Sequence, residues 1–554
     1  MAKPQARQLR LDSAPIGDDA AGIGPEHWSR LFYTHVFREF SDREFRDLYA
    51  DGGRYPVSPS LLACVMILQF MFRVSDRQAV DATIMRRDWR IALGIGPDWE
   101  GFCPTVLVRF RQRLKRAGRE KEIFDKVLGQ VRKLGVLPGR RLRVDATHLL
   151  ADVARLSRVD MIQEAIRIVV CAADKAHPEL RGNVAFRRLQ EAYGEEAWLG
   201  AGRSDEGRLV ELGRDAKVLL ELCGERPVRG KEVLEQILRE NFLFPEDGQD
   251  PRPLEPDERP GDHIVTPHEP DVRVGKKGDK LWMGDKVHLV ETAEPGATNF
   301  IVDVLTTDPR LEDSTMTETL LQRARFGMGP FEALIADGGY SSAHNSKQAA
   351  ALGVELISPP RSSNSRAAIP ASAFAIDLAR RVARCPEGKE SIVWQVHDRR
   401  INIRFRRADC RACPRRAECT KSPQGRSLGI SRDYDQLLLD RARAQTAAFK
   451  ELYRCRAAIE GTISKLVHNH GLRRSRYRGP TGRALHAWMA AAALNVRRLL
   501  GCLAAGEPPE GEAFCAFSAP FAAALRALSR PVEAICRLAL GHPSRTLRFA
   551  RSTL

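Results

Sequence analysis

The sequence predicts an α/β protein: a mixed sheet flanked by helices, preceded by a helical N-terminal domain and interrupted by a cysteine-containing insertion. Three observations predict this class. Helix-compatible apolar patterns dominate residues 27–138, strand and helix patterns alternate from 280 to 360, and cysteines gather between 385 and 419. Consecutive strands followed by crossover helices favour a mixed sheet with helices on its faces.

The N-terminal part reads as a tail followed by helices. Residues 1–26 contain no apolar signal segment and are expected to be a disordered tail. In 27–138, "SPSLLACVMILQFMFRV" predicts a helix that starts after Ser58, and "DRQAVDATIMRRDWRIALGI" predicts another with Asp76 as its N-cap. "FCPTVLVRFRQRLKRAG" predicts an amphipathic basic helix. Such helices suit a DNA-binding domain, and they suit an ordinary helical domain equally well.

The sheet is expected within residues 139–360, with a helical insertion at 152–270. "GRRLRVDATHLLADV" supplies the first strand, and the Pro/Asp/Glu-rich end of the insertion is expected to be a linker or exposed loop. The later strands are "LWMGDKVHLVETA", "NFIVDVLTTD", "FEALIAD" and "VELISPP". Two helices separate the last three strands: "EDSTMTETLLQRARF", capped at Asp313 or Ser314, and "SSAHNSKQAAALG".

Charge indicates a polyanionic partner. Lysine and arginine number 88 against 71 acidic residues, a net charge of +17. Residues 361–480 hold 27 basic and 11 acidic residues, a net charge of +16. Such a concentrated field attracts DNA or RNA, and the alternative is a basic surface kept for solubility. No stretch approaches the roughly 18 apolar residues of a membrane span, so a cytoplasmic protein with reduced cysteines and no membrane partner is expected.

Two carboxylates stand on predicted strands. Asp145 lies within the first strand, and Asp337 ends the strand in "FEALIADGGYSS". Asp-Gly is ordinary turn chemistry, which gives Asp337 a purely structural interpretation. If the two strands are neighbours, however, the carboxylates lie side by side and repel. Two magnesium ions roughly 4 Å apart would supply the counter-charge and could cleave phosphodiesters.

Glu460 is the candidate third acidic residue. On one helix at 100° per residue, Tyr453, Arg456 and Glu460 fall within about 60° of one another. The alternative is a surface glutamate with an i−4 arginine partner, worth a few tenths of a kcal/mol.

Together these motifs resemble the DDE transposases of bacterial insertion sequences, in the branch with the Y-R-E signature. The resemblance covers about residues 27–501. It is carried by "VDAT" around Asp145, "LIADGGY" around Asp337, the trio Tyr453, Arg456 and Glu460, and the segments "GDKVHL" and "GLRRSRYRG".

The resemblance implies a ribonuclease H-like core and two Mg²⁺ or Mn²⁺ ions held by the catalytic residues Asp145, Asp337 and Glu460. It implies binding to terminal inverted repeats, strand cleavage, transfer to target DNA, and a homodimer on paired ends in the bacterial nucleoid. The DNA-binding candidates are Tyr453, Arg456, Arg473, Arg474, Arg476 and Arg478.

One position departs from the family pattern. A basic residue often stands seven positions after the glutamate, and here that position is Val467. Lys465 points to the opposite side of the helix and His468 is only near. The phosphate contact is then expected from Arg473, Arg474 or Arg476, which changes how the DNA end is positioned.

Four cysteines, Cys385, Cys410, Cys413 and Cys419, lie in the basic insertion at 361–445. A CxxC pair with two flanking cysteines can form a tetrahedral thiolate site for structural Zn²⁺, and the alternative is reduced or accidental thiols. The other eight cysteines are expected to be small core hydrophobes.

The last segments complete the domain plan. Residues 446–501 are expected as core helices that begin near Thr446, and 502–554 as a helical tail without an assigned function. In "GLRRSRYRG", Tyr477 among arginines permits stacking on an unpaired base, and the alternative is a solvated loop.

Two other functions remain open from the residues. A catalytically impaired, transposase-derived repressor would bind element ends without magnesium-dependent nicking. A host nuclease with the same core would cut unrelated DNA as readily as inverted repeats.

Overall fold

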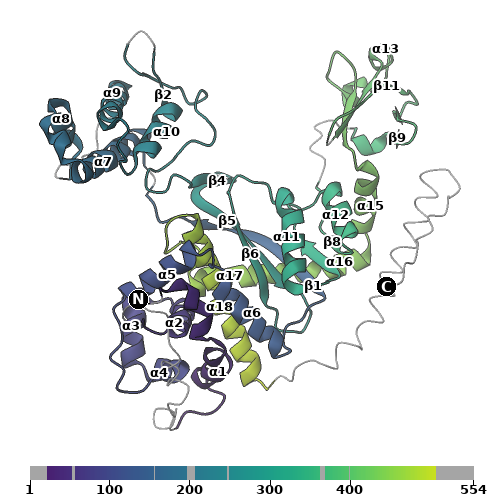
Figure 1. Cartoon of the computed structure of the whole chain (residues 1–554). Helices are drawn as coiled ribbons and strands as arrows, with labels where there is room; N and C mark the ends of the chain where they lie inside the picture. Colours follow the sequence, from purple (N-terminus) through teal and green to yellow (C-terminus); the bar gives the residue numbers. More distant parts are fainter. Residues whose placement is uncertain are drawn as a thin grey trace.

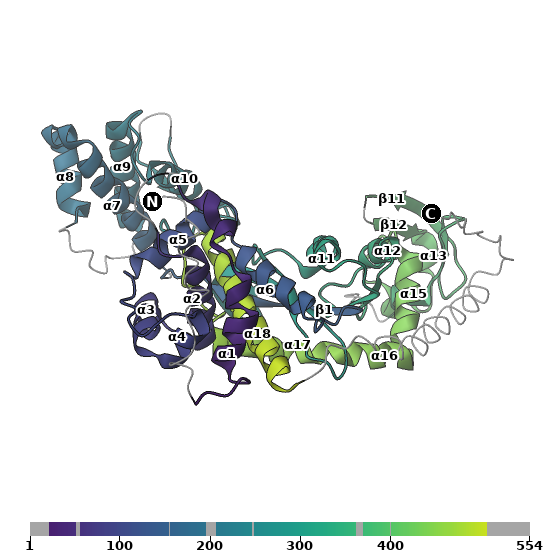
Figure 2. The same ribbon diagram turned by 60° about the horizontal axis from the view of Figure 1, so that its bottom comes forward.

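The computed structural model describes residues 22–50, 52, 56–154, 156–195, 206–245, 249–361, 369–398 and 400–506. The predictions for the N-terminal tail up to residue 21 and for the C-terminal tail from residue 507 lie outside these residues. The N-terminal helices and the sheet form the centre of the molecule. A helical insertion and a cysteine-containing module stand at opposite ends of it in both views (Figure 1, Figure 2).

The N-terminal part is helical, as predicted. Its elements are α1 (Trp28–His35), α2 (Pro59–Phe72), α3 (Asp76–Met85), α4 (Arg87–Leu93), α5 (Thr105–Arg116) and α6 (Glu122–Lys133), with 3₁₀ turns at Phe37–Glu39 and Asp42–Leu48. Ser58 caps α2 by accepting a hydrogen bond from the Leu61 amide at 3.2 Å. α2 is apolar all round and almost wholly buried, which is typical of a central core helix.

The predicted Asp76 cap is wrong. Ser75 is the N-cap of α3, and it forms a capping box with Gln78. The Asp76 carboxylate accepts hydrogen bonds from the side chains of Arg111 and Gln69 instead. The predicted single helix also divides into α3 and α4, because Arg86 adopts an extended conformation.

The sheet is mixed, as predicted. It contains β1 (Arg141–Leu150), β4 (Arg273–Lys277), β5 (Lys280–Thr292), β6 (Ile301–Thr307), β7 (Ala333–Ala336) and β8 (Glu355–Ile357). β5 pairs antiparallel with β1 on one side and with β4 and β6 on the other, whereas β7 and β8 run parallel to β1. β4 was missed by sequence reasoning, since its sequence RVGKK has no strand-like apolar alternation.

Helices cover both faces of the sheet. α11 (Asp313–Met328) and α12 (Ala343–Ala351) share a core with Leu334 and Ala336 of β7. α16 (Ala447–Arg454) packs through Phe449 against the alternate residues Ala333 and Ile335, which face the other way. α11 begins after Glu312, which makes no side-chain capping bond, so the predicted cap at Asp313 or Ser314 is wrong.

The last helices begin where predicted, because Thr446 caps α16 by accepting from the Phe449 amide. The assumed continuous helix through Glu460 is wrong, however. A 3₁₀ turn at Cys455–Ala457 separates α16 from α17 (Ala458–His470). α18 (Pro480–Ala504) follows.

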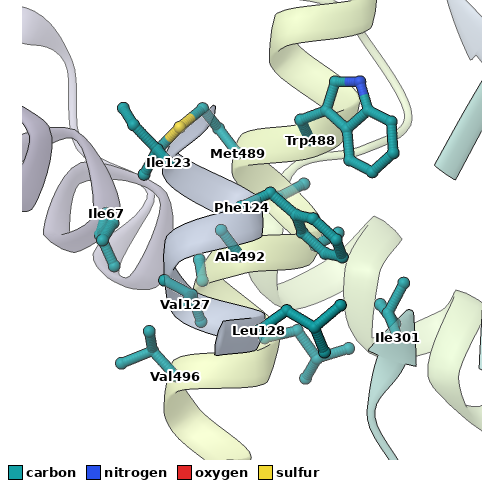
Figure 3. Close-up of a cluster of buried hydrophobic side chains, with 14 of the residues drawn as sticks. Ile67, Ile123, Phe124, Val127, Leu128, Ile301, Trp488, Met489, Ala492 and Val496 are labelled. Carbon is teal, nitrogen blue, oxygen red and sulfur yellow. The ribbon is translucent and has the colours of Figure 1, made fainter. Parts of the chain in front are cut away.

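One continuous core joins the N-terminal helices to the sheet. Figure 3 shows its centre, where α18 lies against α6, α2 and the start of β6. The rings of Phe124 on α6 and Trp488 on α18 have centroids 4.8 Å apart. The N-terminal helices are therefore packed onto the sheet through α18.

The helical insertion has a separate core. Its helices are α7 (Arg158–Ala176), α8 (Val184–Tyr193), α9 (Glu206–Cys223) and α10 (Lys231–Asn241), with a 3₁₀ turn at Pro178–Gly182 and the short strands β2 (Phe242–Leu243) and β3 (Arg252–Pro253). After β3 the chain is loop up to β4, as predicted. Arg483 of α18 is fully buried and pairs with Glu269, Asp271 and Asp285, which fastens the end of the insertion to the sheet.

The described residues between 369 and 445, here called the cysteine module, also have a separate core. The module contains β9 (Ala375–Asp377), β10 (Val382–Arg384), β11 (Ser391–Val396), β12 (Arg400–Phe405), β13 (Ser427–Ser431), α13 (Arg407–Arg411), α14 (Arg416–Cys419), α15 (Tyr434–Ala444) and a 3₁₀ turn at Ala371–Ala373. β11, β12 and β13 form an antiparallel sheet, and α15 packs on α12.

Across the described part of the chain, no single helix has the length and apolarity to cross a membrane; α2 and α3 pass that test only as a pair bent by 105°. The described cysteines are free thiols. Cys64, Cys223 and Cys502 are buried as predicted, whereas Cys103 is exposed.

The packing of α18 on α6 predicts a large stability effect at Phe124. Phe124→Ala removes a fully buried ring and leaves a cavity, so we expect the free energy of unfolding to fall by about 3–5 kcal/mol. Urea denaturation followed by circular dichroism measures the change. Val108→Ala, at a side chain exposed on α5, is the control and should shift it by less than about 0.5 kcal/mol. Equal midpoints for the two variants would contradict the packing.

Candidate functional site

The parallel pairing of β1 with β7 brings Asp145 and Asp337 together. Val144 pairs with Ala336, so the same register sets the next residues, Asp145 and Asp337, side by side. Adjacent strands lie about 4.8 Å apart, and residues in register point to the same face. The condition set by the sequence, that these two strands are neighbours, is therefore met.

Asp337 is also the turn residue that its sequence suggested. Its Oδ1 accepts a hydrogen bond from the Gly339 amide at 2.8 Å, and its carbonyl oxygen accepts one from Ser358 Oγ at 2.6 Å. Arg361 adds a bond to the Gly339 carbonyl at 2.7 Å. The turn therefore holds the Asp337 backbone firmly at the end of β7.

Arg456 links Asp145 to Glu460. From the 3₁₀ turn between α16 and α17, its Nη2 lies 3.0 Å from Asp145 Oδ2 and its Nη1 lies 3.0 Å from Glu460 Oε1. The Asp145 side chain is 14% exposed and that of Glu460 is 64% exposed. The site thus combines a shielded carboxylate on a strand with a solvent-facing one on a helix.

The electrostatics of Asp145 reflect this arrangement. Burial raises the pKa of its carboxyl above the usual range, and the nearby charges of Asp337 and Glu460 raise it further. The Ala146 amide and Arg456 oppose these effects. Tyr453, half-buried at the end of α16, has a pKa raised mainly by burial and also by the three carboxylates. All three acidic residues therefore lie within electrostatic reach of one another.

The donor set suits a hard divalent cation, because Mg²⁺ is bound through carboxylates, water and substrate phosphate oxygens. In the portion of the chain that is described, no three His, Cys, Asp or Glu side chains converge closely enough to hold an ion as they stand. At Asp145 and Glu460, the positive charge of Arg456 partly compensates the carboxylates.

The loop at 471–479 is docked beside the end of β1. The Leu150 amide donates to the Arg473 carbonyl at 2.9 Å, and the Ser475 amide donates to the Leu150 carbonyl at 2.8 Å. Arg473 Nη1 donates to the His148 carbonyl at 2.9 Å, and Arg476 Nη1 donates to the Val74 carbonyl at 2.5 Å. The guanidinium groups of Arg473 and Arg476 thus bond the loop to β1 and to the N-terminal helices.

Arg474 and Arg478 differ from their neighbours because both are exposed. Arg474 has a side chain that is 66% exposed, and its contact with Asp152 is long at 3.8 Å. These two arginines therefore present their charge to solvent.

Tyr477 is packed inside the loop's docking site. Its ring lies 4.7 Å from the Arg111 guanidinium and 6.0 Å from the ring of His486. A groove of about 730 Å³ runs beside it, between α3, α5 and the loop. The basic residues lining this groove are Arg73, Arg111, Lys115, Arg476 and Arg478. In this structure Tyr477 joins the loop to the N-terminal helices, rather than presenting an open face for an unpaired base.

Val467, where a basic residue was sought, packs against the main hydrophobic core. This apolar side chain offers no charged group to a phosphate.

The four cysteines of the module surround one pocket of about 420 Å³. The Lys389 amide donates to Cys385 Sγ at 3.3 Å, and the Arg426 amide donates to Cys410 Sγ at 3.4 Å. Burial raises the pKa of the Cys419 thiol, and the other three thiols raise it further. The predicted thiols therefore line one pocket, with backbone donors directed at two of the sulfurs, but among the described residues no three of them converge closely enough to hold an ion.

Sequence reasoning missed two buried charged residues beneath the carboxylates. Arg143 lies two positions before Asp145, and Glu291 faces it across β1 and β5. Both are charged residues inside predicted buried strands, and that was the signal that could have identified them.

Two family models match the chain. The one described as "Transposase domain (DUF772)" matches residues 23–113, which include α1 to α4 and most of α5. The one described as "Transposase DDE domain" matches residues 384–500, which include the four cysteines of the module, Arg456 and Glu460. No protein of curated function and no solved structure matches. These two matches support the resemblance of the chain to the DDE transposases of insertion sequences.

Proposed function

We propose that this chain is a transposase that binds the terminal inverted repeats of its insertion sequence, cleaves the DNA strand and transfers it to target DNA. The observation that carries the proposal is the placement of Asp145 and Asp337 on paired parallel strands, with Glu460 joined to Asp145 through Arg456. The sheet order, with β5 antiparallel to β1 and β7 and β8 parallel to it, supports a ribonuclease H-like core.

In this proposal Asp145, Asp337 and Glu460 hold two Mg²⁺ or Mn²⁺ ions. When bound, such ions activate the attacking oxygen and stabilise the leaving one in phosphodiester cleavage. β1 and β7 fix the two aspartates, whereas the exposed Glu460 side chain keeps freedom to adjust. In the same proposal Arg456 and Tyr453, which lie beside the carboxylates, contact the DNA backbone.

DNA contact is assigned to two regions. Arg474 and Arg478 offer exposed charge beside the end of β1, while Arg473 and Arg476 position the loop that carries them. The N-terminal helices, joined to that loop by Tyr477, would bind the inverted repeats. Joining two ends requires two copies of the site, so we infer a homodimer that acts on DNA in the bacterial nucleoid.

A structural Zn²⁺ in the cysteine module belongs to the same proposal. Cys385, Cys410, Cys413 and Cys419 supply the four sulfur donors that such an ion prefers. Two of these sulfurs, Cys385 Sγ and Cys410 Sγ, accept hydrogen bonds from backbone amides. The module's hydrophobic core is small, so metal affinity would add to its folding free energy.

Asp337→Asn tests the catalytic assignment. The asparagine amide can keep the turn, but it lacks the negative charge that would bind the metal ion. We therefore expect the rate of cleavage of labelled inverted-repeat ends to fall more than about a hundredfold, which exceeds the usual effect of removing a residue that only hydrogen-bonds to a metal ligand. Affinity measured by gel shift should change less than about twofold. Asp435→Asn, at an exposed carboxylate of α15, is the matched control and should cleave normally. Retained cutting by Asp337→Asn refutes the assignment, and binding without nicking by the unmodified chain favours the repressor.

Arg474 and Arg478 are expected to contact phosphates. The double substitution Arg474→Ala/Arg478→Ala should weaken binding to specific and unrelated DNA alike and lower the salt dependence of the affinity by about two units of slope. Arg181→Ala/Arg226→Ala removes two exposed charges from the helical insertion as a control. Equal salt slopes for the two double variants would contradict the assignment.

The zinc assignment is tested by metal content. We expect about one Zn²⁺ per purified chain by mass spectrometry, lost on chelation together with the module's thermal transition. Cys410→Ser should lower the zinc content, whereas Cys103→Ser, an exposed cysteine outside the module, should leave it unchanged. Zinc-free protein with an unaltered melting curve would overturn the proposal.

A further inference from the structure

Glu291 is a buried carboxylate at the centre of a four-residue network. It lies in β5, is 0% exposed, and faces Arg143 directly across the strand pair. Its Oε2 accepts from Arg143 Nε at 2.8 Å. Its Oε1 accepts from Thr462 Oγ1 at 2.7 Å and from Arg498 Nη1 at 2.6 Å. Arg498 Nη2 also donates to Thr462 Oγ1 at 2.6 Å, so the hydroxyl both gives and receives a bond.

Two partners of Glu291, Arg143 and Thr462, belong to elements that carry the carboxylates, and the third, Arg498, lies on α18. Arg143 lies two residues before Asp145 on β1 and therefore faces the same side of the sheet. Thr462 lies two residues after Glu460 on α17. Arg143 Nη1 also donates to the carbonyl of Cys455 at 3.0 Å, and Cys455 immediately precedes Arg456. The network thus connects the segments that carry three of the proposed site residues.

The chemistry of the network favours positioning over simple stability. A buried ion pair gains little over well-packed apolar side chains of similar volume, because both charges lose their hydration. Directional bonds, by contrast, fix the relative placement of the elements that they join. A network of this kind under Glu460 and Asp145 would restrict how α17 lies against β1.

We propose that Glu291, with Arg143, Thr462 and Arg498, forms a positioning network that sets α17 and the 3₁₀ turn against β1, and so sets Glu460 and Arg456 relative to Asp145. The inference rests on the proposed metal-dependent function of these carboxylates. Glu291 is a positioning residue, since it acts through its partners and touches none of the reacting groups.

Glu291→Gln tests the network with little change of shape. All three partners donate hydrogen bonds to the Glu291 carboxylate. The glutamine amide offers them one uncharged oxygen and an NH₂ group, which cannot accept a hydrogen bond. We expect the cleavage rate to fall about 10- to 100-fold and the Mg²⁺ concentration for half-maximal rate to rise. Mn²⁺ binding, followed by electron paramagnetic resonance without DNA, should weaken in parallel. Affinity for DNA ends should change less than about twofold.

Glu269→Gln is the matched control. Glu269 is also buried and paired with an arginine, Arg483, but its bonds fasten the helical insertion instead of α17. The Glu269→Gln variant should unfold more easily, but it should need the same Mg²⁺ concentration for half-maximal rate. The double variant Thr462→Val/Glu291→Gln should lose clearly less cleavage rate and Mn²⁺ affinity than the sum of the losses in the two single variants, because both substitutions break the same network.

The outcomes separate the inference from the proposed function. If Glu291→Gln matches Glu269→Gln in Mn²⁺ affinity and metal requirement while Asp337→Asn is inactive, the network inference is overturned and the catalytic assignment stands. If Asp337→Asn cleaves normally, the proposed function fails. In that case Mn²⁺ affinity still decides the network: weakening by Glu291→Gln alone supports it, and equal affinities overturn it.

Discussion

The parallel pairing of β1 with β7 is the constraint on which the candidate site depends. It places the backbones of Asp145 and Asp337 side by side, and the negative charge of Asp337 helps to raise the pKa of the Asp145 carboxyl. Arg456 compensates part of this charge by bridging Asp145 and Glu460. Under the proposed function, the Asp145 oxygen bound by Arg456 would also serve an ion, so guanidinium and cation compete for the same acceptor.

Much of the fold could be predicted from the sequence, because strands and helices of the sheet carry local apolar patterns. The incorrect predictions concern residues whose conformation depends on contacts with residues distant in the sequence. Asp76 does not cap α3 because its carboxylate is engaged by Arg111 on α5. The helix before Glu460 breaks at Cys455, whose carbonyl accepts a bond from Arg143 on β1. Neither Arg111 nor Arg143 is close in sequence to the residue it affects, so no local pattern could indicate the outcome.

The candidate site likewise has parts that the sequence indicates and parts that depend on tertiary contacts. The sequence placed Asp145 and Asp337 on two strands of one sheet, and the pairing of those strands in the structure is what makes the two residues neighbours. In "GLRRSRYRG", however, nothing local distinguishes the arginines that hold the loop from those that face solvent. Arg473 and Arg476 are assigned to the first group only by carbonyl acceptors in β1 and beyond α2. Composition indicates that charge is concentrated here, and tertiary contacts determine which part of it can reach a phosphate.

The division of hydrophobic cores separates a central unit from two outlying ones. The N-terminal helices, the sheet and α18 share one core, and the 471–479 loop is bonded to both β1 and the N-terminal helices. The helical insertion and the cysteine module have separate cores. The insertion is tied to the centre by the buried pair of Arg483 and Glu269, whereas Lys347 of α12 and Asp433 of the module form a partly exposed pair. Polar contacts at a surface exchange readily with water, whereas separating a shared core exposes apolar area at about 25 cal/mol per Å². The elements that carry the carboxylates and the exposed arginines of the loop are therefore held together by the shared core.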